Sequence, residues 1–352
     1  MSAIGQNQVV EDQIQIPVEL CKRDSDLFVV LLTLPRGYFR EPFFIDSLAR
    51  SFSILKAEIK LPEEDELLAR PVHYDEKDER VAYIPIDEFI EKFSSTGIDK
   101  KLGFIFHMSR CGSTLATQML ASSDRFFVLS EPTIINAVID PALNISQEKR
   151  DLLLKASIKA LADCSPRICE RVFIKFRSWN TLYLNQILKD FPDITWMFIH
   201  RHGLEVLCSV LEKPPGWIRS RMGYAKYFST FLKVNENDVR IMNNDEYITR
   251  MLGAFCRIAK NAPSKKKLLV DYYDLKDSFI VAINKLWNIY LNNKEIEIMN
   301  HVSQLYSKDV NKKEKFQSDC EVKRAKATKI QEEFVDRFVE SERKKITKLT
   351  NL

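Results

Sequence analysis

The segment HMSRCGST at residues 107–114 combines the residue types that bind phosphate. It follows a short apolar run and precedes a stretch with helical periodicity, so it would join a buried strand to the start of a helix. In that arrangement the backbone N–H groups of the turn and the positive end of the helix dipole face one point. Gly112 allows a close backbone approach, Ser113 and Thr114 add hydroxyls, and Arg110 adds a positive charge. The segment therefore predicts a phosphate-binding loop.

This loop differs from the one that binds nucleoside triphosphates. That loop has the pattern GxxxxGK[ST], in which the Lys contacts the β- and γ-phosphates and the Ser or Thr binds magnesium. Here Ser113 stands between Gly112 and Thr114, where the Lys is required, and the first glycine is also missing. The sequence therefore favours a nucleotide phosphate bound without magnesium. An ordinary strand-to-helix turn with a capping Ser is the alternative.

Several motifs in this order resemble those of the sulfotransferase superfamily that uses 3′-phosphoadenosine 5′-phosphosulfate (PAPS) as donor. The likeness is to bacterial sulfotransferase-family proteins and, in motif spacing, to tyrosylprotein sulfotransferases. SRCGSTL at 109–115 resembles the family's loop for the 5′-phosphate of the donor. Arg201, at the end of FPDITWMFIHR, and Ser209, eight residues later, are similar to the pair that holds its 3′-phosphate. The resemblance implies sulfuryl transfer, without a metal, to a hydroxyl or amine, with adenosine 3′,5′-bisphosphate (PAP) as product.

The pair Arg201 and Ser209 also has a physical logic. Arg201 would leave the carboxyl end of a sheet strand, where ligands of open α/β sheets bind. Ser209 would project from the following helix, so that a charged fork and a hydroxyl take one phosphate from two sides. The resemblance covers residues 103–212 well and 265–290 loosely, and residues 315–328 resemble a late family segment near the donor site.

The loop departs from the commonest family form at two positions, with Ser109 where Pro is usual and Cys111 where Ser is usual. Arg110 keeps the cation, and hydroxyls and amides remain. The predicted donor site comprises the loop residues and the later pair: Ser109, Arg110, Cys111, Gly112, Ser113, Thr114, Arg201 and Ser209.

Glu131 and Lys175 match two further positions of the family. Glu131 resembles the catalytic base of tyrosylprotein sulfotransferases, and Lys175 resembles the Lys that stabilises the leaving group in the same relatives. The resemblance implies that Glu131 accepts the proton of the acceptor, while Lys175 and Arg110 neutralise the charge that develops on the leaving oxygen. His107 and His202 are rival bases, because the pKa of imidazole suits proton transfer near neutral pH.

Structural explanations stay open for these residues. Glu131 next to Pro132 could serve only to stabilise a helix dipole, and Lys175 could be a solvated lysine at a strand end. Trp217 is expected at the mouth of the acceptor site, within a helical, irregular region at 214–262 that would form a lid. No His pair has the i, i+4 spacing of a helical zinc site, so we expect no metal.

The pattern of apolar runs predicts the fold. From residue 103, short apolar runs alternate with helix-length stretches, as in βαβ units. Strands are expected at 103–108, 126–130, 172–176, 196–200 and 267–273. They predict a P-loop-type three-layer α/β/α fold with a mostly parallel central sheet. Residues 1–100 would form a small N-terminal α+β lobe, 101–310 the α/β domain, and 311–352 a helical extension packed on it.

Composition sets the remaining expectations. The chain has 352 residues, of which 45% are hydrophobic and 29% charged, as in ordinary globular proteins. Its net charge of +4 is too small to indicate nucleic acid as a partner. Scattered cysteines and the lack of an apolar span or signal favour a soluble, cytoplasmic protein. Expected partners are a small-molecule or peptide acceptor and a second copy of the chain, and two roles stay open for the N-terminal lobe, as part of the acceptor pocket or as the dimer contact.

Two alternatives to a sulfotransferase are open. A kinase of the P-loop class would share the strand, loop and helix but would need magnesium and, normally, the loop Lys. A non-catalytic relative would keep the nucleotide-binding loop but show no turnover.

Overall fold

A computed structural model describes residues 13–35, 39–54, 78–94, 101–264, 266–305, 307–309 and 320–347. Its centre is a five-stranded sheet in the order β5-β6-β4-β7-β8, in which every neighbouring pair is parallel. The strands are β4 (Lys101–His107), β5 (Phe126–Ser130), β6 (Arg171–Lys175), β7 (Thr195–His200) and β8 (Lys267–Asp271). The expected α/β fold with a parallel central sheet is confirmed.

The strands form where the sequence has continuous apolar runs. β5 and β6 are buried along their whole length, and β4 from its second residue on. A strand covered on both faces has mainly apolar side chains, because both directions of the pleat point into protein, and the polar residues of these strands lie at their ends. The run 103–108 is therefore a central strand and not one half of a hairpin.

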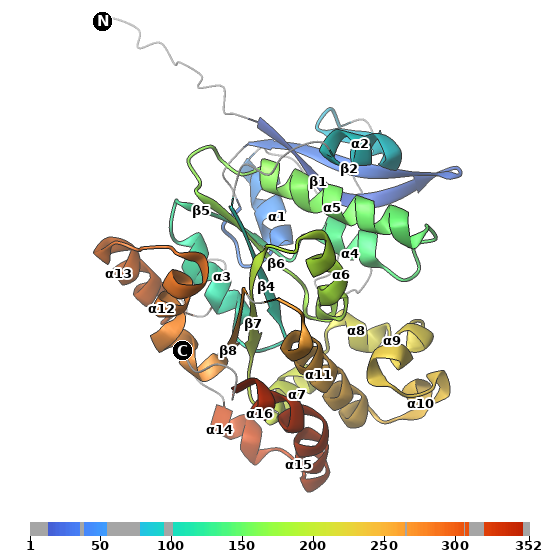
Figure 1. Ribbon diagram of the computed structural model, residues 1–352, viewed down its shortest axis with the longest axis vertical. Coiled ribbons are helices and arrows are strands. Elements are labelled where there is room, and N and C mark those ends of the chain that lie inside the picture. The colour runs from blue at the N-terminus through green and yellow to red at the C-terminus, as the bar shows by residue number, and fades with distance from the viewer. Residues whose placement is uncertain are drawn as a thin grey trace, which may run out of the picture.

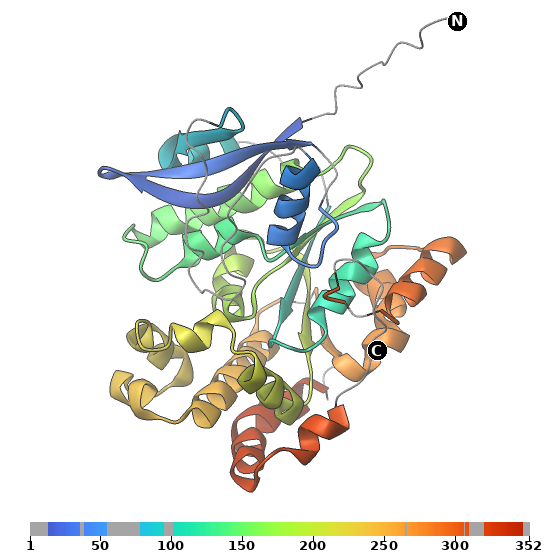
Figure 2. The same ribbon diagram turned by 180° about the vertical axis from the view of Figure 1, so that it is seen from behind.

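Helices cover both faces of the sheet, as Figures 1 and 2 show from opposite sides. On one side lie α3 (Ser113–Ala121), α12 (Leu275–Trp287) and α13 (Asn293–Val302). On the other side lie α4 (Thr133–Ile139), α5 (Gln147–Asp163), α6 (Leu184–Asp190) and α11 (Asn244–Asn261). The 3₁₀ segment η1 (Ser178–Tyr183) joins β6 to α6, and η2 (Tyr272–Asp274) joins β8 to α12.

A second, antiparallel sheet makes up the N-terminal region, in the order β1-β2-β3. Its elements are β1 (Gln13–Arg23), β2 (Asp26–Pro35), α1 (Phe44–Ile54), β3 (Val81–Pro85) and α2 (Ile86–Ser94). β1 contacts α4 and α5, and α2 contacts α5, so this sheet packs on one helical layer (Figure 1). The sequence prediction missed β1 and β3. The expected domain limits after residues 100 and 310 border segments outside the described residues.

The region between β7 and β8 is helical, as expected. It contains α7 (Gly203–Glu212), α8 (Gly216–Arg219), α9 (Ala225–Leu232), α10 (Glu236–Ile241) and α11. Trp217, which was expected at the mouth of the acceptor site, is instead in the core. It is only 1% exposed, and it packs on the ring of Phe255 and on Tyr247, whose hydroxyl donates to the Trp217 carbonyl.

The helical extension expected at 311–352 is interrupted within its described residues, 320–347. Its pieces are α14 (Cys320–Ala325), α15 (Lys329–Phe334), a π-helical turn η3 (Val335–Glu340) and α16 (Ser341–Thr347). Ile330 is 60% exposed, whereas Val335 and Val339 are buried. The insertion of a π turn rotates the apolar stripe by part of a turn, which a regular 3.6-residue period does not predict. Within the described ranges, no helix has the length and apolarity needed to cross a bilayer.

Candidate functional site

The phosphate loop joins the carboxyl end of the central strand β4 to α3. Ser109, Arg110 and Gly112 have positive φ angles of 84°, 46° and 82°. For the two residues with side chains, this conformation costs on the order of 1–3 kcal/mol each, and such strain persists mainly at functional sites. A Cβ at position 112 would lie 2.5 Å from the ring of Tyr272, so only glycine fits there. The predicted turn geometry is therefore present, and Tyr272 packs on its backbone.

The first backbone N–H groups of α3 receive no side-chain cap from the described residues. The N-cap of this helix is Gly112. The uncapped N–H groups carry the positive end of the helix dipole. Arg110 lies beside them; its Nη2 donates to the Lys213 carbonyl at 3.3 Å, and its buried Nε has no hydrogen-bond partner in the part of the chain described. An anion with several acceptors fits this set of donors.

Cys111 serves the loop through its backbone. Its thiol donates to the Ile199 carbonyl of β7 at 3.1 Å, and burial raises the pKa of the thiol to about 12. The thiol is therefore neutral and tied to the sheet. The Ser109 N–H donates to Nδ1 of His107 at 3.2 Å, which fixes the first residue of the turn.

Lys175 and Glu131 meet next to the loop. Lys175 ends β6 and is completely buried, and its Nζ lies 2.8 Å from Oε1 of Glu131, which follows β5. The same Nζ donates to the Thr114 hydroxyl at 3.3 Å. Three neighbouring strands thus deliver a lysine, a carboxylate and the phosphate loop to one point, as the sequence predicted. A solvated strand-end lysine is excluded by this burial.

The charges around Glu131 control its protonation. Burial on its own raises the pKa of Glu131, but Lys175, His107 and Arg177 lower it to about 2. Burial, together with Lys175, lowers the pKa of His107 to about 3, so the imidazole is neutral at pH 7. Lys175 and Arg177, at 2.8 and 3.7 Å from the carboxylate oxygens, therefore hold Glu131 ionised. Its side chain remains 18% exposed and can be reached from outside.

The two histidines proposed as rival bases have different positions. Nε2 of His107 lies 3.8 Å from Glu131 and, among the described residues, has no hydrogen-bond partner. Nδ1 of His202 accepts from the Leu204 N–H at 3.3 Å and so caps the start of α7. Geometry thus leaves Glu131 and His107 as the groups that could receive a proton at the loop.

Arg201 lies at the end of β7, as predicted. Its Nε donates to Oε2 of the fully buried Glu205 at 2.6 Å, and its guanidinium lies 4.3 Å from the ring centre of Tyr272. Tyr272 in turn covers Gly112, so Arg201 is connected to the phosphate loop through one aromatic ring. Ser209 is on α7, about two turns beyond Arg201, and is partly exposed.

A third helix contributes to the same cluster. Arg324 of α14 donates from Nε to Oε1 of Glu205 at 2.8 Å and from Nη2 to the Tyr273 hydroxyl at 2.8 Å. Tyr273 also hydrogen-bonds to Glu205. The late segment singled out in the sequence therefore reaches the Arg201 region through Arg324, while its part at 315–319 lies outside the described residues.

Sequence reasoning missed two residues of the site, Lys308 and Phe43. Burial, and then the charges of Arg110 and Lys175, lower the pKa of Lys308 to about 8. The Phe43 ring centre lies 5.1 Å from Nζ of Lys175 and 5.9 Å from Nζ of Lys308. Neither residue belongs to a motif, and both are far from the loop in sequence, so only the fold reveals them.

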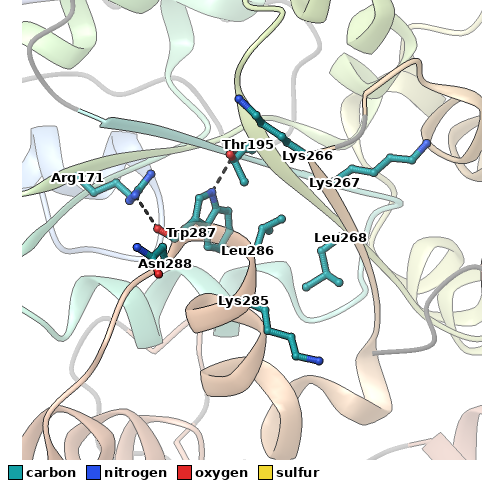
Figure 3. A pocket seen from close by; sticks show the side chains of 9 residues that line it. All are labelled: Arg171, Thr195, Lys266, Lys267, Leu268, Lys285, Leu286, Trp287 and Asn288. Atoms are coloured by element: carbon teal, nitrogen blue, oxygen red, sulfur yellow. Dashed lines mark hydrogen bonds between the residues drawn. The ribbon is translucent and has the colours of Figure 1, made fainter.

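A cavity of about 550 Å³ opens at the opposite end of the sheet (Figure 3). It is lined by the first residues of β6 and β8 and by the end of α12: Arg171, Thr195, Lys266, Lys267, Leu268, Lys285, Leu286, Trp287 and Asn288. Arg171 donates to the Trp287 carbonyl at 2.8 Å, and the Trp287 indole donates to the Thr195 carbonyl at 3.3 Å. Lys267 donates to two backbone carbonyls. The contacts of Trp287 tie α12 to the amino ends of β6 and β7, and those of Lys267 tie β8 to the end of α11.

No three His, Cys, Asp or Glu side chains come together in a metal-binding group in the described part of the chain. The ionic groups at the loop are mostly cations, with Glu131 the one carboxylate that contacts Lys175 there. Their arrangement suits an anion directly. The expectation of a metal-independent reaction stays a prediction.

Comparison with known proteins gives structural likenesses only. No family model and no curated protein matches the sequence. A sulfotransferase domain from the curacin biosynthetic pathway is 13% identical over 56% of this chain and 77% of that one, with a TM-score of 0.35. Sulfotransferase STF9 from Mycobacterium avium is 10% identical over 61% and 71%, with a TM-score of 0.38. Mouse sulfotransferase SULT7A1, solved with PAP, is 14% identical over 73% and 89%, with a TM-score of 0.38. All three of these proteins are sulfotransferases, and their identity to this chain is between 10% and 14%.

Proposed function

We propose that this protein is a sulfotransferase that uses PAPS as donor and a hydroxyl or amine as acceptor. The observation that carries the proposal is the contact of buried Lys175 with both Glu131 and Thr114 at an uncapped phosphate loop. A buried ammonium between a carboxylate and a phosphate site can serve a leaving oxygen on one side and a proton acceptor on the other.

The donor fits the residues present. The amides at the start of α3, with Ser113, Thr114 and Arg110, would hold its 5′-phosphate, and the buried Arg110 Nε has no partner among the described residues and would supply a further donor. Arg201 and Ser209 would hold its 3′-phosphate. When bound, PAPS supplies an activated sulfuryl group on a phosphate leaving group.

Lys175 and Glu131 would have different roles in the transfer step. The acceptor oxygen forms its bond to sulfur as the bridging S–O bond breaks, and the electron pair remains on the phosphate oxygen, where Lys175 and Arg110 neutralise it. The acceptor proton goes to Glu131. In the ion pair the pKa of Glu131 is about 2, which makes it a weak base. Any anion that draws the Lys175 ammonium towards Thr114 weakens this pairing and raises the proton affinity of Glu131.

Calorimetric binding of PAP with and without magnesium tests the donor. Wild type is compared with Arg201→Ala and Arg201→Lys; the second keeps a positive charge next to Glu205, which would otherwise be buried without that partner. Arg240→Ala is the matched control, because Arg240 is an exposed arginine of the lid that pairs with Glu236.

We expect PAP to bind equally well with and without magnesium. Arg201→Ala should lose ~1.5–3 kcal/mol of PAP binding free energy, as for a charge-assisted hydrogen bond, and Arg201→Lys should lose somewhat less. The control should bind as wild type does. If the protein fails to bind PAP but binds ATP in the presence of magnesium, the sulfotransferase proposal is wrong and a kinase is favoured.

A further inference from the structure

The cavity at the amino ends of the strands lies at the end of the sheet opposite the phosphate loop, and the proposed reaction does not use it. Its volume of about 550 Å³ is within the range of small-molecule sites. Cations make up much of its lining, and no described residue of the lining is an acid: Arg171, Lys266, Lys267 and Lys285 carry the charges. A concave surface with charge of one sign attracts ions of the opposite sign.

Arg171 carries a charge that the described residues leave without a carboxylate contact. Arg171 is 8% exposed, and its Nη1 and Nη2 donate to backbone carbonyls, those of Leu102 at 3.4 Å and Trp287 at 2.8 Å. The neighbouring Glu170 makes its short contacts, at 2.7 and 2.8 Å, with Arg125. Burial lowers the pKa of Arg171, and the charge of Glu170 opposes this only in part. An anion that reaches such a buried cation stabilises it.

The three lysines place their charges around the rim of the cavity. Their stems line it, whereas Figure 3 shows their ammonium groups directed away from the indole of Trp287. Lys266 and Lys285 are exposed, and Lys267 is half-buried, with its Nζ 2.8 Å from two backbone carbonyls at the end of α11. Of the three, only Lys266 pairs with a carboxylate in the described part of the chain, that of the exposed Asp193 at 3.4 Å. The rim is therefore positively charged.

The surface between these charges is apolar. Leu268 and Trp287 are buried, and Leu286 is half-buried. The indole N–H of Trp287 donates to the Thr195 carbonyl at 3.3 Å, so the ring offers a ligand its carbon atoms and not its donor. A molecule in the cavity would remove apolar surface from water, which favours binding of an apolar body.

We propose that this cavity binds a small amphiphilic anion, a molecule with one anionic group on an apolar body. The anionic group would meet Arg171 and the lysines of the rim, and the apolar body would lie against Leu286 and Trp287. Both parts are needed, because the rim alone would bind any anion weakly and the apolar surface alone has no charge to select one. The inference is independent of the proposed sulfotransferase function, since no lining residue belongs to the phosphate loop or to its ion pair.

Calorimetry with three probes separates the two parts of the ligand. Octanoate carries both parts, acetate has the anionic group with almost no apolar body, and 1-octanol has the apolar body without a charge. The place of binding is read from the indole N–H signals of 15N-labelled protein, among which Trp287→Phe identifies the signal of Trp287. Trp179 and Trp217, which do not line the cavity, provide the reference signals.

Two variants alter the charges of the cavity. The double variant Lys266→Gln/Lys285→Gln removes two exposed charges from the rim. Its matched control is Lys329→Gln/Lys344→Gln, which removes two exposed charges from α15 and α16. Arg171→Met removes the buried cation and keeps an apolar stem. The double variant decides the case alone if Arg171→Met does not fold.

We expect octanoate to bind about tenfold or more tightly than acetate and 1-octanol, and to shift the signal of Trp287 but not those of Trp179 and Trp217. Octanoate affinity should fall about fivefold in the double rim variant and about tenfold in Arg171→Met, and it should stay within about twofold of wild type in the control.

Three results would overturn the inference: no binding of octanoate or binding that leaves the Trp287 signal in place, binding of 1-octanol as tight as that of octanoate, and equal octanoate affinities of wild type and the double rim variant. None of these results involves PAP, so the donor proposal stands or falls separately.

Discussion

Replacement of Lys175 by Met removes one partner of a buried ion pair. Lys175 is completely buried, and its Nζ lies 2.8 Å from the carboxylate of Glu131. The variant leaves Glu131 with the more distant cation Arg177, at 3.7 Å, while burial continues to oppose its charge. We therefore expect Lys175→Met to be strongly destabilised at pH 7, and Glu131→Gln as well, because it leaves the lysine charge buried.

The distance sets the size of the effect. At 2.8 Å, and with an effective dielectric constant of about 20, the Coulomb attraction of the pair is at most ~6 kcal/mol. Desolvation offsets part of it, so each single variant should lose ~3–5 kcal/mol of unfolding free energy. The double variant with both changes carries neither charge. Its loss should be smaller than the sum of the single losses by ~2 kcal/mol or more.

Denaturant unfolding of the four proteins at pH 7 measures this coupling. A second series towards pH 4 adds a test of sign. In wild type the pKa of Glu131 is about 2, below its ordinary value, so its contribution to stability is present above pH ~4.5 and is lost as the pH falls towards 2. In Lys175→Met the pKa rises above the ordinary value, so the deficit relative to wild type should shrink on acidification. Additive losses, or a deficit that is independent of pH, would refute the ion pair as the organising contact of the site.

Two further predictions follow from other groups. Lys308→Ala should weaken PAP binding by about tenfold at pH 7 and flatten its pH dependence, since in wild type the pKa of Lys308 is near 8 and the charge is lost above it; calorimetry between pH 6.5 and 9 checks both effects. His200 is buried at the end of β7, near Asp271 and Arg343, and its pKa is about 3, so the unfolded chain binds a proton below pH 6.5 that the folded chain does not. The free energy of unfolding should therefore fall on acidification, by ~2 kcal/mol between pH 6.5 and 5 for this residue. Denaturant unfolding of His200→Asn should show a fall over the same pH range that is smaller by ~2 kcal/mol. If the fall in unfolding free energy is the same in wild type and His200→Asn, the imidazole can take up a proton in the folded state.

The parts of the fold that sequence predicts well are those in which a single local signal decides. The runs at 126–130 and 196–200 are apolar at every position but the last and are buried throughout, as expected for strands that are covered on both faces. β1 was missed because it alternates polar and apolar residues within an otherwise polar start, and β3 because its short run adjoins a clear amphipathic helix. Pairing with β2 makes both strands stable, and pairing across a long separation has no local signal.

The same limit applies to the site. The loop and Glu131 and Lys175 lie at the ends of strands in a parallel sheet, so their meeting follows from topology once the strands are known. Lys308 and Phe43 reach the site from segments whose path is set by packing on the finished domain. Trp217 shows the converse, because it was expected at the mouth of the acceptor site and is a core residue at 1% exposure.

Backbone strain connects the loop and the ion pair. Glu131 has a φ of 66°, unusual for a residue with a long side chain, and its N–H donates to the Lys175 carbonyl at 2.7 Å. This hydrogen bond extends the β5–β6 ladder by one residue, and the left-handed conformation then turns the Glu131 side chain towards Nζ of Lys175. Relaxing it would cost the ion pair its 2.8 Å geometry. Ser109 and Arg110 hold similar strain at the end of β4. The strained residues follow β4 and β5, the two strands that flank the strand of Lys175, and such strain is expected where a fold has to fix charges before its ligand arrives.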